Sequence, residues 1–66
     1  MRYEKLTPEA LVGLVWRREG AQREALMSHA RSQGFHFDRE LWLLVESEAL
    51  EMGVIVITPR HCYYLG

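Results

Sequence analysis

The chain has 66 residues and a mass of 7.7 kDa, which suffices for one small domain and excludes a multidomain enzyme. Eight lysines and arginines oppose nine aspartates and glutamates, and a net charge of -1 supplies no overall field that would attract a polyanion. Hydrophobic residues make up 48% of the sequence, a generous share for a domain that is expected to expose about 4,300 Å² when folded. Part of this surplus is expected to serve an interface.

The single cysteine, Cys62, cannot form an internal disulfide, and no second cysteine is present for a thiolate zinc site. The longest nearly uncharged run, residues 10–16, is far shorter than the roughly 20 residues that cross a bilayer. Residues 1–14 lack the pattern of a secretory signal. We therefore expect residues 1–66 to form a single cytoplasmic domain without a membrane anchor or cofactor.

The first helix is predicted over residues 8–19, with Thr7 as N-cap, Pro8 in the first turn and Gly20 as the stop. Its core stripe is predicted to consist of Leu11, Leu14 and Val15. Val12 and Trp16 extend the apolar surface to a second side of the helix. Gly13 is unfavourable inside a helix, and we expect another backbone to pack closely against it.

A second helix is predicted over residues 22–33, ending at Gly34. Leu26 and Ala30 are expected to point inward with His29 beside them, while Arg23, Met27 and Arg31 share another face. The two phenyl rings of Phe35 and Phe37 are expected to plug the core from one side of an extended segment.

A third helix is predicted over residues 39–52, between the N-cap Asp38 and the stop Gly53. The spacing indicates a buried stripe that consists of Trp42, Val45, Ala49 and Met52. The pattern then becomes β-branched and aromatic, which predicts a C-terminal hairpin with strands at residues 54–58 and 62–65. Pro59 favours a turn longer than two residues between them.

Three helices followed by a two-stranded β-hairpin define an α+β fold class. Helix ends at Arg17 to Gly20, at Gln33 to Phe35 and at Glu51 to Ile55, before a short β return, give the chain a pattern that resembles the winged-helix variant of the helix-turn-helix group. The resemblance covers nearly the whole chain. It implies that the third helix enters the major groove of DNA and that the hairpin is a wing that touches the backbone or the minor groove.

The outer surface of the third helix is predicted to consist of Glu40, Leu43, Glu46, Ser47, Leu50 and Glu51. Carboxylates that face a duplex meet electrostatic repulsion, whereas Leu43 and Leu50, two turns apart, are spaced like an apolar anchor pair with a polar rim. We therefore predict a non-catalytic interaction module that docks on a protein partner or self-associates as a dimer. The predicted interface residues are Glu40, Leu43, Glu46, Leu50 and Trp16. In the alternative interpretation, the glutamates are an ordinary solvated face, and a helix rotated by about 40 degrees places both leucines in the core.

A second hypothesis is a DNA-binding transcriptional regulator that uses a patch of arginines. The candidate phosphate contacts are Arg17, Arg18, Arg23, Arg31, Arg39 and Arg60. Glu19 and Glu24 lie among these cations and weaken the patch as a phosphate-binding surface.

The sequence contains no enzyme motif. His61 and Cys62 are adjacent, so in a strand their side chains point to opposite faces and cannot form a thiol and base pair. His29 and His36 are seven residues apart across a helix stop, unlike two metal ligands on one helix turn. We predict no catalytic residues and no metal site.

Overall fold

The first and third helices begin where a side-chain oxygen caps the backbone. In the computed structural model, which describes residues 4–66, α1 (Pro8–Arg17) starts after Thr7, whose Oγ1 accepts from the amide of Ala10 at 3.1 Å. Helix α3 (Arg39–Glu51) starts after Asp38, whose Oδ1 accepts from the amide of Leu41 at 2.8 Å. These contacts satisfy amides that have no partner inside the helix. Both predicted N-caps are confirmed.

The helices end at or close to the predicted stops. Helix α2 (Arg23–Ser32) is followed by Gly34 with φ 94°, and α3 is followed by Gly53 with φ 72°. A positive φ of this size suits glycine, which has no Cβ to clash. Helix α1 ends at Arg17, two residues earlier than predicted, because the chain turns at Arg18.

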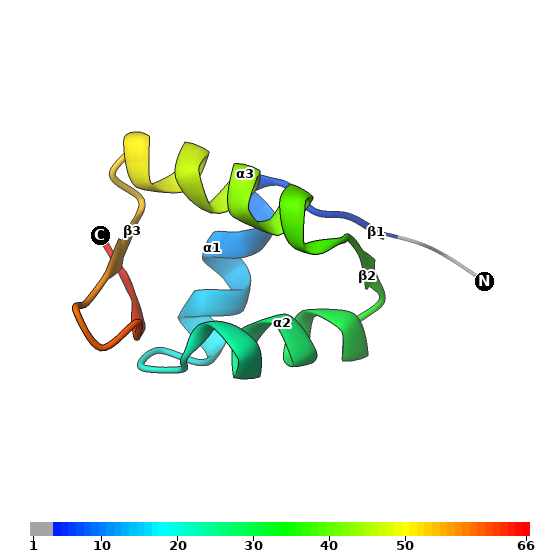
Figure 1. Ribbon diagram of the computed structural model, residues 1–66, viewed down its shortest axis with the longest axis horizontal. Helices are drawn as coiled ribbons and strands as arrows, with labels where there is room; N and C mark the ends of the chain where they lie inside the picture. Colours follow the sequence, from blue (N-terminus) through cyan, green and yellow to red (C-terminus); the bar gives the residue numbers. More distant parts are fainter. Residues whose placement is uncertain (1–3) are drawn as a thin grey trace.

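Two small pairs of strands close the two ends of the molecule (Figure 1). At one end, β1 (Glu4–Lys5) pairs in parallel with β2 (Phe35–His36). At the other, β3 (Ile55–Ile57) pairs antiparallel with β4 (Tyr63–Leu65), with Val56 opposite Tyr64. The predicted C-terminal hairpin is confirmed, with a turn longer than two residues.

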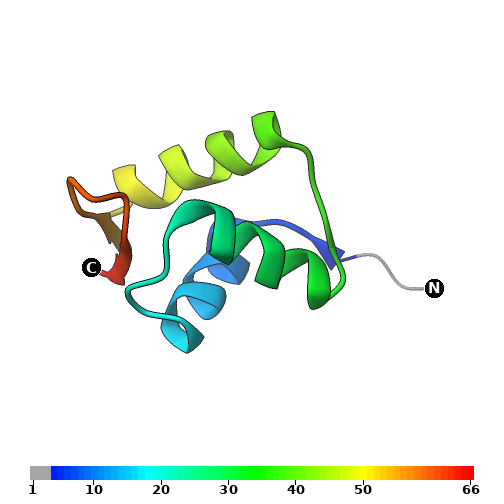
Figure 2. The same cartoon turned by 60° about the horizontal axis from the view of Figure 1, so that its bottom comes forward.

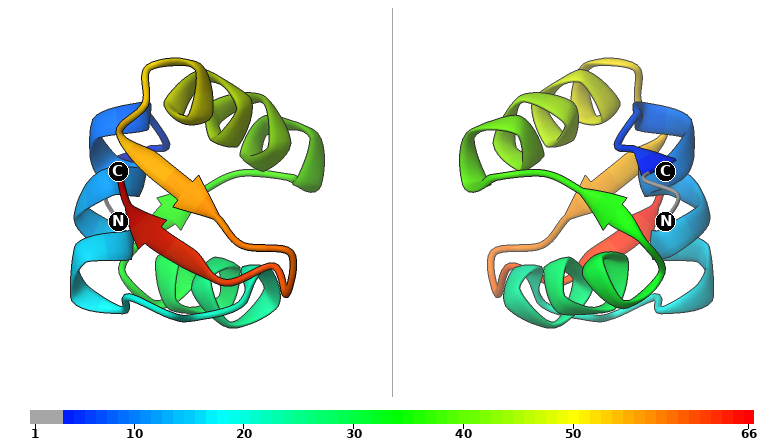
Figure 3. Two further views of the ribbon diagram at one scale, coloured as in Figure 1. Left: turned by 90° about the vertical axis from the view of Figure 1, so that its left-hand side faces the viewer. Right: turned by 90° about the vertical axis from the view of Figure 1, so that its right-hand side faces the viewer.

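The segment between α1 and α2 runs along the free edge of β4. The amide of Gly20 donates to the carbonyl of Tyr63 at 2.8 Å, and the amide of Tyr63 donates to the carbonyl of Ala21 at 3.0 Å. A bridge between Gln22 and Cys62 extends this contact. The hairpin is thereby tied to the start of α2, and Figure 3 shows it between α3 and α2, with α1 running beside it.

Helix α1 packs against α2, α3 and β4, and Figure 2 shows α3 on one side of the pair formed by α1 and α2. The buried hydrophobic side chains of these elements form one core. The accessible surface of 4537 Å² is close to the value expected for a compact chain of this mass. The predicted α+β class is confirmed. The predicted core positions that are buried are Leu11, Leu14, Val15, Leu26, Ala30, Trp42, Val45 and Ala49, and Phe35 and Phe37 pack against them.

Three core predictions are wrong. Met52, the C-cap residue of α3, is exposed, whereas Met27 is buried although the sequence placed it on a face with Arg23 and Arg31. Gly13 has no close neighbour among residues 4–66: a Cβ added there would meet nothing within 4 Å. The predicted close packing at Gly13 is therefore not made by the described part of the chain.

Candidate docking surface on the third helix

The inner side of α3 contains a carboxylate. Glu46 lies one turn after Trp42, and only 6% of its surface is exposed. The prediction that Glu46 lies on the outer surface is wrong, because one helical turn after Trp42 it lies on nearly the same side of α3, where it meets Arg23 of α2 and Tyr63 of β4. A buried carboxylate requires compensating partners.

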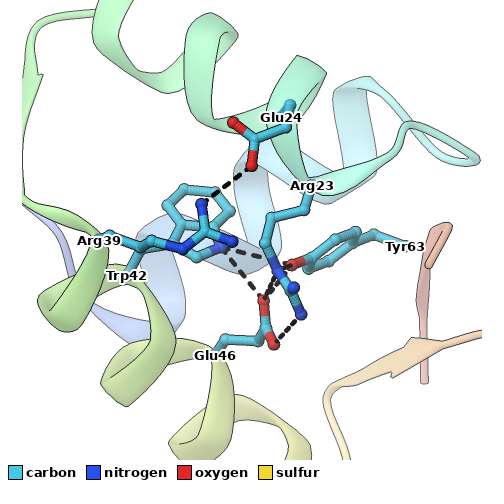
Figure 4. A network of polar contacts seen from close by, with 6 residues as sticks. All are labelled: Arg23, Glu24, Arg39, Trp42, Glu46 and Tyr63. Carbon is cyan, nitrogen blue, oxygen red and sulfur yellow. Dashed lines mark hydrogen bonds and ion pairs between the residues drawn. The ribbon is translucent and has the colours of Figure 1, made fainter.

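Glu46 receives donors from three elements (Figure 4). Arg23, the first residue of α2, donates from Nη2 to Oε2 at 2.8 Å and from Nε to Oε1 at 3.1 Å. The indole of Trp42 donates to Oε1 at 3.1 Å, and the hydroxyl of Tyr63, the first residue of β4, also donates to Oε1. The hydroxyl of Tyr63 in turn accepts from Arg23 Nε at 3.0 Å. We call these four residues the buried polar cluster.

The cluster shifts the protonation equilibria of its members. Hydrogen bonding to Glu46 and then to Tyr63 raises the pKa of Arg23, so the guanidinium stays charged. Burial, followed by the hydrogen bond to Glu46, raises the pKa of Tyr63 to about 12, against the opposing contacts of Trp42 and Arg23. The phenol is therefore neutral near pH 7 and acts as a donor. The cluster fixes the rotation of α3 relative to α2 and the hairpin, and so determines which residues α3 exposes.

The opposite side of α3, which we call its outer face, is apolar and acidic. Its central stripe is Glu40, Leu44, Ser47 and Glu51, at i, i+4, i+7 and i+11. Leu43 and Leu50 flank the stripe on one side and Glu48 on the other. The exposed fractions are 37% for Leu43, 59% for Leu44 and 41% for Leu50.

Within residues 4–66, the carboxylates of the outer face lack cationic partners. The ion pairs among residues 4–66 are Arg23 with Glu46 and Arg39 with Glu24, so Glu40, Glu48 and Glu51 are not neutralised within this part of the chain. The predicted interface residues Glu40, Leu43 and Leu50 therefore share one exposed surface, and Glu46 does not belong to it. Leu44, the most exposed leucine, was not predicted, although its spacing of four residues from Glu40 placed it on the same stripe.

A scan against family models and searches of curated proteins and solved structures find no match to this chain. The surface is therefore interpreted from its own residues.

The six arginines of the predicted phosphate patch do not form one surface. Arg23 is bound to Glu46, and Arg39 pairs with Glu24 at 3.0 Å. Arg31 stacks its guanidinium over the ring of Phe37, 4.6 Å from the centroid. Arg60 lies at the hairpin turn, whereas Arg17 and Arg18 lie at the end of α1. The arginines that lie side by side without an ion pair in residues 4–66 are therefore Arg17 and Arg18.

Trp16, the remaining predicted interface residue, lies on α1 and not beside the outer face of α3. It is the most exposed large hydrophobic side chain of the described residues, at 66%. Its surroundings on α1 are Glu9, Gly13 and Arg17, all exposed and at helical spacing from one another. We call these four residues, with Arg18 at their end, the outer face of α1.

The remaining candidate side chains form no metal centre in the part of the chain that the structure describes. No group of three or more His, Cys, Asp or Glu residues lies close enough there to hold a metal ion. Cys62 is half-buried, with its Sγ directed at the carbonyl of Arg60 at 3.8 Å. None of the described helices is long and apolar enough to cross a bilayer.

Proposed function

We propose that the chain is a small, non-catalytic, winged-helix-like interaction module that docks on a protein through the outer face of α3. The observation that carries the proposal is the combination, on one helix face, of three exposed leucines with three carboxylates that lack ion pairs within residues 4–66. Apolar anchors surrounded by a polar rim are typical of protein interfaces.

The buried polar cluster supports this assignment because it makes the outer face rigid. Three donors hold Glu46, so α3 cannot rotate to bury Leu43 or Leu50 without breaking an ion pair at 2.8 Å. A surface that is fixed before binding loses less conformational entropy when a partner docks. The exposure of the leucines is thus a property of the folded state.

The chemistry of the outer face defines the partner. Leu43, Leu44 and Leu50 require an apolar groove, and the carboxylates of Glu40, Glu48 and Glu51 require lysines or arginines around that groove. We therefore propose a partner whose binding site is apolar at its centre and basic at its rim.

The winged-helix-like arrangement keeps DNA binding as the alternative function. In this arrangement α3 would enter the major groove, where its outer face would bring Glu40, Glu48 and Glu51 towards phosphates. Arg23 and Arg39, two of the cations that would compensate them, already pair with carboxylates. These contacts favour the protein partner over the nucleic acid.

The test is affinity capture from a nuclease-treated native extract with three forms of the chain. The wild type is compared with a Leu43→Ser/Leu50→Ser variant and with a Val56→Ser control, which removes an exposed apolar side chain from the hairpin. We expect the same protein to be captured by the wild type and the control and to be lost with the α3 variant. Equal capture by all three forms, or salt-sensitive binding of duplex DNA by wild type and α3 variant alike, would contradict the proposal.

A further inference from the structure

The outer face of α1 contains an unfilled space at Gly13. Glycine in the interior of a helix destabilises it relative to alanine, and the cost is usually offset by a close approach of other atoms. Here, apart from the backbone of α1 itself, no atom of residues 4–66 lies within 4 Å of the position that a Cβ would occupy. The described residues therefore leave this space free for a contact with another molecule.

The space at Gly13 opens into a shallow groove of about 330 Å³. Its lining consists of Glu4, Gly13, Leu14, Arg17, Gln33 and Phe35. Trp16 and Arg17 follow Gly13 by three and four residues and therefore flank it on the same helix face. The groove is thus lined by the cation Arg17, and the exposed ring of Trp16 lies beside Gly13 on the same helix.

The charges of the two outer faces select how two copies of the chain could meet. A parallel contact of α1 with α1 would bring Arg17 and Arg18 against the same arginines, and a contact of α3 with α3 would oppose carboxylates. An antiparallel contact of α1 with α1 would oppose Glu9 to Arg17 but would leave the carboxylates of α3 uncovered. A contact of α1 with α3 places arginines that have no ion pair in residues 4–66 against carboxylates that also have none. Figure 3 shows α1 and α3 along different sides of the molecule, and Trp16 of α1 and Leu44 of α3 are both exposed.

We propose that a second copy of the chain docks the outer face of its α3 across α1 at Gly13, with Leu44 in the open space and the glutamates beside Arg17 and Arg18. This inference rests on the proposed function and names the partner as the chain itself. Because the two contacting surfaces differ, the contact is head-to-tail. It closes into a symmetric dimer or ring only if the rotation between successive copies brings the last copy back to the first.

The experiment reverses the charges of each face in the purified full chain. Sedimentation velocity at low ionic strength, over a wide range of concentration, then measures self-association. Arg17→Glu/Arg18→Glu and Glu40→Lys/Glu51→Lys are each expected to weaken self-association about tenfold or more. Mixing the two variants is expected to restore association, because each then presents the charge that the other requires.

Two controls separate the proposed contact from general effects of charge and size. Lys5→Glu/Arg60→Glu carries the same net charge as the α1 variant but leaves the outer face of α1 intact, so it is expected to self-associate like the wild type. Gly13→Gln fills the open space with a residue that favours helices and is expected to weaken association, whereas Ser28→Gln on the exposed side of α2 is not. Circular dichroism of each variant verifies that the fold is retained.

A wild type that stays monomeric at every concentration overturns the inference, and so does a charge-exchanged mixture that stays monomeric. If the pure chain is monomeric but Leu43→Ser/Leu50→Ser still abolishes capture of another protein, the proposed function stands and the partner is not the chain itself. If neither self-association nor capture that depends on α3 is found, both proposals fail.

Discussion

Glu46 and Glu48 lie two residues apart on α3, yet one is buried with three donors around it and the other is exposed without an ion pair in residues 4–66. The inner side of α3 combines a carboxylate with the tryptophan and tyrosine of the core, and the outer side combines carboxylates with leucines. Polarity therefore does not distinguish the two sides of this helix. The distinction lies in whether each polar group has a partner inside the chain.

This difference implies that the inner side of α3 determines the stability of the fold and that the outer face determines association with a partner. Groups of the buried polar cluster are linked to one another, so removing one member leaves the others desolvated and unpaired. Groups of the outer face have no such partners in the described chain, so their removal should leave the folded state almost unchanged. Substitutions on the two sides of α3 are therefore expected to have separate effects.

The largest effect is expected for Glu46→Ala. Loss of this carboxylate leaves Arg23 partly buried without its counter-ion, and breaking a buried ion pair typically costs about 3 kcal/mol of unfolding free energy or more. Glu48→Ala, the matched control, is expected to change the unfolding free energy by less than about 0.5 kcal/mol. Urea titration followed by far-UV circular dichroism measures both.

Should Glu46→Ala not fold at all, the double variant Arg23→Met/Glu46→Leu keeps this prediction testable. Replacing both charges with apolar groups of similar size is often nearly neutral, so the double variant is expected to be more stable than Glu46→Ala. A double variant that is equally unfolded would show that the ion pair is not the reason for the loss.

An intermediate effect is expected for Tyr63→Phe. The phenol oxygen donates to Glu46 and accepts from Arg23, and hydrogen bonds to charged groups contribute about 2 kcal/mol. The neighbouring Tyr64, whose ring lies on the exposed side of the hairpin, supplies the control Tyr64→Phe with an expected change below about 0.5 kcal/mol. Equal losses for the two substitutions would show that the cluster contributes no more than a surface hydroxyl.

The same residue makes stability depend on alkaline pH. The pKa of Tyr63 is about 12 in the folded chain against an ordinary value of 10.0, so above pH 10 the folded state retains a proton that the unfolded state has lost. Its contribution is fully present below pH 10 and declines as the pH rises towards 12. The urea midpoint is expected to fall over this range in the wild type and to fall less in Tyr63→Phe.

Most of the fold follows from local signals in the sequence. The caps at Thr7 and Asp38, the stop at Gly53 and the change to β-branched residues at Val54 determine where elements begin and end. These are short-range effects of backbone geometry and hydrogen bonding, so they can be predicted without knowledge of the tertiary contacts. The α+β class could be predicted for the same reason.

The buried polar cluster could not be predicted from such local signals. Arg23, Glu46 and Tyr63 come from elements that are far apart in the sequence, and periodicity along α3 assigned a glutamate to the surface by its charge alone. The one available signal was the spacing of Glu46 from Trp42 by one helical turn, which placed the carboxylate next to the buried stripe. Tertiary pairing decided its burial.

The smallest effect on stability is expected at Leu44. This side chain is 59% exposed, whereas its neighbour Val45 is buried, so Leu44→Ala should change the unfolding free energy by less than about 0.5 kcal/mol while Val45→Ala costs about 2 kcal/mol. Under the proposed self-contact, the same Leu44→Ala substitution is expected to weaken association measured by sedimentation velocity. A leucine whose removal destabilised the monomer would belong to the core of the domain. A leucine whose removal reduces association alone belongs to the interface. Measuring the unfolding free energy and the association of Leu44→Ala and Val45→Ala therefore determines where the core of the chain ends and its docking surface begins.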